Sequence, residues 1–149
     1  MTSLRPAISP THDRLVDALL WALTFASAGL TLWLSLGPVP PGASAFPDAD
    51  KVFHGVAYFV TTLLFLFAAV WRPGRGPGPL ARFGPLVLVA VIGAGLLVEY
   101  LQGALTTRRG AELGDWVADM AGVLGAALVH WIVRRFTSES VAHADEVDG

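Results

Sequence analysis

The sequence predicts an all-α membrane protein in which four transmembrane helices form a bundle with short loops. Hydrophobic residues make up 54% of the 149-residue chain and charged residues only 15%. A soluble domain usually carries about 25% charged residues, so this chain has too few to cover a surface that faces water. Four separate apolar segments also approach the ~20 residues that a helix needs to cross the hydrocarbon layer. Because backbone polar groups must be paired internally in lipid, each segment is expected to be helical.

Stretches that contain Pro and Gly separate the four predicted helices. The helices are expected over residues 15–36, 52–71, 83–105 and 114–136. Between them lie the sequences GPVPPG, RPGRGPGP and TTRRG. Pro and Gly end helices, so these stretches are expected to be loops. The membrane domain therefore spans residues 15–136, after an N-terminal segment of residues 1–14. The polar, acidic tail of residues 137–149 is expected to be disordered.

The first apolar segment has a competing interpretation as a cleaved signal peptide. Arg5 and Arg14 resemble a charged leader, and Ala43-Ser44-Ala45 resembles a cleavage site made of small residues. Apolar cores of signal peptides usually contain ~7–15 residues, and the apolar segment here is longer. A retained first helix is therefore favoured. Cleavage would leave three helices that carry the same polar residues.

The distribution of basic residues predicts the orientation in the membrane. With a cytoplasmic N-terminus, the inner flanks of the helices contain Arg5, Arg14, Arg72, Arg75, Arg82, Arg134 and Arg135. The outer flanks then contain only Lys51, Arg108 and Arg109. This excess of inner basic residues predicts that both termini are cytoplasmic. The net charge of −2 and the lack of a basic stripe argue against a nucleic-acid partner, and the absence of Cys excludes disulfides.

Polar residues of three predicted helices fall at the same end of the membrane domain. His54 and Tyr58 are four residues apart and share a helix face, as do Asp115 and Asp119. Glu99 and Gln102 are three residues apart near the end of the third helix. Ionisable groups within a spanning segment cost a few kcal/mol each and are by default functional. The predicted binding set is Asp50, Lys51, His54, Tyr58, Glu99, Gln102, Arg109, Asp115 and Asp119.

Each of these residues also has a structural interpretation. Asp50 and Asp115 can cap the helices that they open, and Lys51 can reach the headgroups along its apolar stem. The buried acids can belong to a network that only holds the helices together. In that network Glu99 would pair with Arg109, and Asp119 would pair with Lys51 or His54.

Two short motifs resemble the signatures of the VanZ-like membrane proteins. The first is Asp50-Lys51-x-x-His54-x-x-x-Tyr58. The second motif contains the residues Glu99, Gln102, Arg109, Asp115, Gly122 and Gly125. The resemblance implies a four-helix protein of the bacterial cytoplasmic membrane, in a family whose founding member is associated with resistance to teicoplanin, a lipid-tailed glycopeptide. It implies no established reaction. This chain departs from the family at Asp119, where Asn is usual.

Three classes of function remain open for an outward-facing polar pocket. It can bind or modify a membrane lipid, a lipid-linked cell-wall precursor or a lipoglycopeptide, with Arg109 and Lys51 holding a phosphate. It can belong to an enzyme with His54 or Glu99 as acid or base and Asp115 as a further candidate. It can be a polar lock in a membrane scaffold. The acids and His54 match no known zinc spacing, so no metal or other cofactor is expected.

Overall fold

The computed structural model describes residues 10–37, 48–73, 75–105 and 112–147. Four of its helices are long and apolar enough to cross a membrane, so the chain is a multi-pass membrane protein. The α-helices are α1 (Pro10–Leu36), α2 (Ala49–Phe65), α3 (Gly84–Leu105) and α4 (Leu113–Val147). Short elements connect α2 to α3: the π-helix η1 (Leu66–Val70), strands β1 (Trp71–Arg72) and β2 (Gly76–Pro77), and the 3₁₀-helix η2 (Ala81–Phe83).

α1 and α2 begin before their predicted starts, and α4 ends well after its predicted end. α1 begins at Pro10, because proline's fixed φ suits the first turn and no helix breaker follows it before residue 15. α2 begins at Ala49, so Asp50 lies in its first turn and the N-cap position belongs to Asp48. The prediction of a disordered tail from residue 137 is wrong up to Val147, where α4 ends. The tail contains no Pro and no Gly before Gly149, so nothing in it breaks the helix.

The second helix was predicted to continue through Trp71, but α2 ends at Phe65, η1 ends at Val70, and Trp71 begins strand β1. The described residues of 72–79, expected to be a loop, complete a compact reversal. α2 widens into η1, and β1 then pairs antiparallel with β2. The backbone N–H of Gly78 donates to the carbonyl of Val70 at 2.8 Å, and Leu80 donates to Ala69 at the same distance. Gly78 fits only because it lacks a Cβ, which would lie 2.5 Å from the Ala69 carbonyl oxygen. The reversal thus satisfies carbonyls that the end of a helix leaves unpaired.

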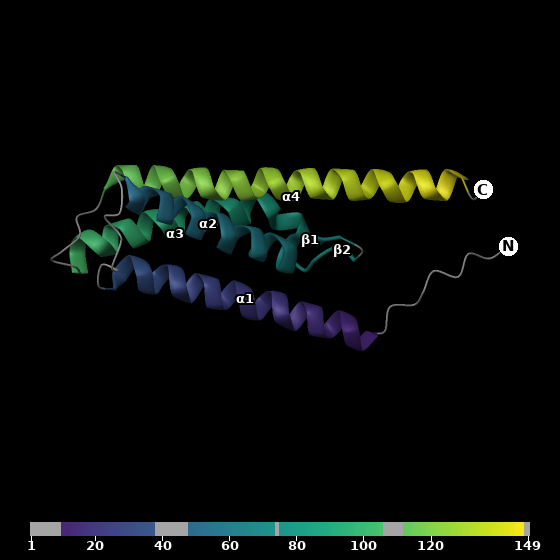
Figure 1. Cartoon of the computed structure of the whole chain (residues 1–149), viewed down its shortest axis with the longest axis horizontal. Helices are drawn as coiled ribbons and strands as arrows, with labels where there is room; N and C mark the ends of the chain where they lie inside the picture. The colour runs from purple at the N-terminus through teal and green to yellow at the C-terminus, as the bar shows by residue number, and fades with distance from the viewer. Residues whose placement is uncertain (1–9, 38–47, 74, 106–111, 148–149) are drawn as a thin grey trace.

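α2 and α4 form the closest helix pair (Figure 1), while α1 packs on α2 and α3 packs on α4. Glycines explain the close approach of α2 and α4. A Cβ built on Gly122 would lie 2.2 Å from the carbonyl oxygen of Gly55, and one built on Gly55 would lie 3.3 Å from that of Ala118. Small residues let membrane helices approach until their backbones touch, and here they bring the start of α2 against the start of α4.

α1 is attached to its neighbours by polar contacts at three levels. Near its start, Asp17 forms ion pairs with Arg72 and Arg75 of the reversal. At mid-height, the hydroxyls of Ser27 and Thr61 lie 2.7 Å apart. At its end, the amide of Gln102 donates to the carbonyl of Ser35 at 2.7 Å. We call the end of the molecule where α1 and α3 finish and α2 and α4 begin the polar end.

Candidate functional site

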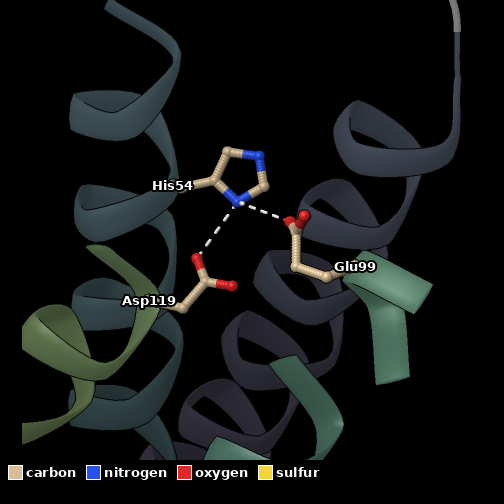
Figure 2. A group of neighbouring side chains, drawn as sticks. All are labelled: His54, Glu99 and Asp119. Carbon is tan, nitrogen blue, oxygen red and sulfur yellow. Dashed lines mark hydrogen bonds and ion pairs between the residues drawn. The ribbon is translucent and has the colours of Figure 1, made fainter. Parts of the chain in front are cut away.

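Three buried side chains meet at the polar end, each from a different helix. His54 of α2 directs its Nδ1 atom toward two carboxylates (Figure 2). The distance from Nδ1 to Asp119 Oδ1 of α4 is 3.1 Å, and the distance to Glu99 Oε1 of α3 is 3.8 Å. Exposure is 8% for His54, 4% for the Glu99 side chain and 1% for that of Asp119. We call His54, Glu99 and Asp119 the buried triad.

The local structure explains why these three groups converge. His54 precedes Gly55, and Asp119 lies one helical turn before Gly122, so the close contact between α2 and α4 brings the two side chains together. Glu99 is positioned separately, because its Oε2 atom accepts a hydrogen bond from the backbone N–H of Glu112 at 3.2 Å. That bond ties α3 to the start of α4.

Several oxygen atoms of the site have no hydrogen-bond partner in the part of the chain that the structure describes. They are Glu99 Oε1, Asp119 Oδ2, Asp115 Oδ1 and Thr62 Oγ1, all of them buried. A buried acceptor without a partner costs about 1–3 kcal/mol, more when it is charged. Three such carboxylate oxygens within one site are acceptors that a bound hydrogen-bond donor or cation would satisfy.

A second group of charges lies nearer to the surface of the polar end. Lys51 Nζ lies 2.9 Å from Asp48 Oδ1, 3.6 Å from Glu112 Oε2 and 3.9 Å from Asp50 Oδ1. Ligand-type atoms of Asp50, Glu112 and Asp115 lie within 4.8 Å of one another, as do those of the buried triad. The site thus has two layers, with the buried triad below and a lysine surrounded by acids above.

The remaining predicted residues occupy distinct positions. Gln102 is buried, and its amide faces α1 through its bond to the Ser35 carbonyl. Tyr58 is buried one turn along α2 from His54, and its ring edge approaches Gly95 of α3. Asp119 pairs with His54, the second of the two partners considered for it. Arg109, with its predicted pairing to Glu99, lies outside the described residues.

The structure also contains an apolar groove, which no pattern in the sequence predicts. It has a volume of about 700 Å³ and lies between α1, α2 and α3. Its walls include Phe25 and Leu32 of α1, Phe65 of α2 and Val91 of α3, and Tyr58 and Val98 line it as well. None of His54, Glu99 and Asp119 lines the groove, but Tyr58, which does, lies one turn of α2 from His54. A groove between helices has no signal in a single apolar sequence, because side chains that line it and side chains that face lipid are equally hydrophobic.

Comparison with protein-family models, with curated proteins and with solved structures found no match for this chain.

Proposed function

We propose that this protein binds a lipid-tailed amphiphile, with the tail in the apolar groove and the polar head at the buried triad. The observation that carries the proposal is that Tyr58, which lines the groove, lies one turn from His54 on α2. An amphiphile has the same arrangement, an apolar chain joined to a polar head. The groove and the triad together match one molecule better than either feature would alone.

The polar half of the site provides the selectivity in this proposal. Within a bilayer, an apolar groove gains little by taking up a tail, because the surrounding lipid is equally apolar. Hydrogen bonds and charge must then distinguish the ligand. The unpartnered oxygens of Glu99, Asp119 and Asp115 are acceptors, so they favour a head that carries ammonium, amide or hydroxyl donors. A phosphate would lie higher, near Lys51, which is one of the two basic residues that the sequence suggests for it.

The proposed membrane and ligand class follow from the resemblance to the VanZ-like proteins. In this proposal the chain is a four-helix bundle of the bacterial cytoplasmic membrane, with both termini in the cytoplasm and the polar end facing outward. An outward-facing site would meet lipids of the outer leaflet, lipid-linked cell-wall precursors and lipoglycopeptides such as teicoplanin. Antibiotic tolerance is one consequence that such binding would have.

Native mass spectrometry of the purified protein tests amphiphile binding directly. Phosphatidylethanolamine supplies a tail and an ammonium head, and phosphatidic acid supplies the same tail without the ammonium. We expect the protein to retain phosphatidylethanolamine preferentially. Ala28→Phe, which fills the groove from α1, should abolish retention, and Glu99→Gln should remove the preference for the ammonium head. Ala26→Phe is the matched control, since Ala26 is exposed on the same helix outside the groove.

Two results would count against the proposal. Equal retention of both lipids by the wild-type protein would show that the triad does not select the ammonium head. Equal loss of lipid in Ala28→Phe and Ala26→Phe would remove the role of the groove.

A second candidate, a structural polar lock, is favoured by the bond of 3.1 Å between His54 and Asp119, which joins α2 to α4. Membrane abundance separates the two candidates. A lock predicts that His54→Ala, Glu99→Gln and Asp119→Asn all lower abundance, whereas a binding site predicts normal abundance with lost lipid retention. Altered lipid or precursor masses in cells that express the protein would instead support an enzyme that uses His54 or Glu99 as acid or base.

A further inference from the structure

We propose that the buried triad binds a divalent transition-metal ion, with His54 Nδ1 and one carboxylate oxygen each from Glu99 and Asp119 as ligands. Zinc is the ion whose ligand preferences the set fits best, because imidazole nitrogen and carboxylate oxygen are both common zinc ligands. The three ligands come from α2, α3 and α4, so the ion would hold three helices at one point.

The distances between the ligand atoms support this assignment. Zinc bonds of about 2.0–2.1 Å in a tetrahedron place neighbouring ligand atoms roughly 3.3 Å apart. The distance from His54 Nδ1 is 3.1 Å to Asp119 Oδ1 and 3.8 Å to Glu99 Oε1. All three ligand atoms lie within 4.8 Å of one another. To reach tetrahedral spacing, the distance from His54 to Glu99 must shorten by about 0.5 Å and the distance between the two carboxylate oxygens by at most about 1.5 Å.

The unpartnered carboxylate oxygens are a second and independent observation. Glu99 and Asp119 are 3% and 1% exposed, and each keeps one oxygen without a hydrogen bond among the described residues. Glu99 Oε1 is such an oxygen and is also the atom that faces His54. A cation would satisfy this atom without any rearrangement of the helices.

Charge balance points the same way. The triad contains two carboxylates and one imidazole, each on a helix that is long and apolar enough to span a membrane. In the described part of the chain, the ion pairs of Glu99 and Asp119 are formed with His54 and with no Lys or Arg. A single divalent ion neutralises two carboxylates and leaves the imidazole neutral, which is the form that binds a metal.

The upper acidic group is a weaker candidate for the same ion. Asp50, Glu112 and Asp115 also place ligand-type atoms within 4.8 Å of one another. Lys51 already places one positive charge beside this group, since its Nζ atom lies 3.6 Å from Glu112 Oε2 and 3.9 Å from Asp50 Oδ1. The upper group also lacks a nitrogen ligand. A transition metal would therefore bind preferentially at the buried triad.

Three protein ligands leave a fourth position for water or for a polar atom of a bound molecule. The ion and an ammonium group would compete for the same carboxylate oxygens, so an amphiphile head would reach this position only through a hydroxyl or carbonyl oxygen. That placement rests on the proposed function, but binding of the ion itself does not. A protein that binds metal and retains no lipid would support this inference and contradict the proposed function. A protein that retains lipid and binds no metal would contradict this inference and support the proposed function.

The test uses the full-length protein in detergent, purified without a polyhistidine tag and equilibrated with ZnCl₂. Elemental analysis after desalting should find one zinc per chain. Replacing zinc by CoCl₂ should give the visible absorption bands of tetrahedral Co²⁺ with nitrogen and oxygen ligands. His54→Ala, Glu99→Gln and Asp119→Asn should each weaken zinc binding at least about tenfold in a chelator competition. Glu99→Gln and Asp119→Asn preserve side-chain shape, and their elution volume in size-exclusion chromatography reports on folding.

Two matched controls locate the ion. Glu112→Gln removes a glutamate of the upper group, and His130→Ala removes a buried histidine at the other end of the protein, where it bonds to the carbonyl of Trp71. Both variants should bind zinc like the wild type. The inference is overturned if the wild-type protein holds neither zinc nor tetrahedral cobalt. It is also overturned if Glu112→Gln or His130→Ala weakens binding as much as the triad variants do.

Discussion

Replacing Gly122 by alanine should separate α2 from α4 and disrupt the candidate site at the same time. The added Cβ would lie 2.2 Å from the Gly55 carbonyl oxygen and 2.9 Å from the Phe59 backbone nitrogen. Both atoms belong to the helix backbone, so no side chain can move aside. A carbon atom approaches a carbonyl oxygen to about 3.3 Å at closest, so the helices must move apart by roughly 1 Å.

The same displacement acts on the bond between His54 and Asp119, because Gly55 follows His54 directly and Asp119 lies one turn from Gly122. Adding about 1 Å to a bond of 3.1 Å takes it beyond hydrogen-bond range. Overpacking costs about 1–3 kcal/mol, and a polar contact between membrane helices contributes about 0.6 kcal/mol, with values up to about 1.7. The expected loss in the free energy of unfolding is therefore about 2–4 kcal/mol.

Unfolding by sodium dodecyl sulfate in mixed micelles, followed by tryptophan fluorescence, measures this loss. Gly93→Ala is the matched control, because a Cβ at Gly93 of α3 meets no atom within 4 Å. Both variants share the same change in helix propensity. Equal unfolding free energies for Gly122→Ala and Gly93→Ala would refute the close contact of α2 and α4. In the double variant Gly122→Ala with Asp119→Asn, the two losses should be smaller than additive, and full additivity would refute the coupling to the site.

Three further predictions concern the polar end. Gly114→Ala should leave the unfolding midpoint unchanged, because its Cβ would meet only the flexible Lys51 side chain, 2.7 Å away at Cε; a clear loss would show that this lysine is fixed. Gln102→Leu should lower the free energy of unfolding by about 1–3 kcal/mol in the same assay, because the Ser35 carbonyl loses its donor; wild-type stability would contradict this. Thr107→Cys should react with a membrane-impermeant maleimide in intact cells, since the chain has no other cysteine. Labelling only after lysis would show that this position faces the cytoplasm, opposite to the predicted orientation.

Composition and the length of the apolar segments predicted the four spanning helices, because a segment that crosses lipid must pair its own backbone polar groups and a helix does so. Apolar length located each helix, and Pro and Gly located the breaks between them. The reversal at Trp71–Pro77 was not predictable in the same way. Its geometry depends on backbone bonds such as Gly78 to Val70, and a Pro- and Gly-rich sequence is compatible with many such arrangements. The continuation of α4 through Val147 was missed because polarity was taken as a sign of disorder, although the segment contains no helix breaker.

At the candidate site, helical spacing placed His54 and Tyr58 on one face and suggested which helices carry the polar residues. It could not decide among partners, since the pairing of Asp119 with His54 depends on how closely two glycines let α2 and α4 approach. Lys51 pairs instead with Asp48, which the sequence analysis had not singled out. The apolar groove could likewise not be predicted from the sequence, because it depends on the positions of three helices and not on any one segment.

The length of α4 has a mechanical consequence. Its 35 residues extend about 52 Å at 1.5 Å per residue, against a hydrocarbon layer of about 30 Å. One uninterrupted helix therefore begins beside Asp115 and extends beyond the ends of α2 and α3 (Figure 1). A twist or a pull on its distant end would reach Asp119 without any hinge to absorb it. Contacts made in water on one side of the bilayer would thereby reorient a carboxylate on the other.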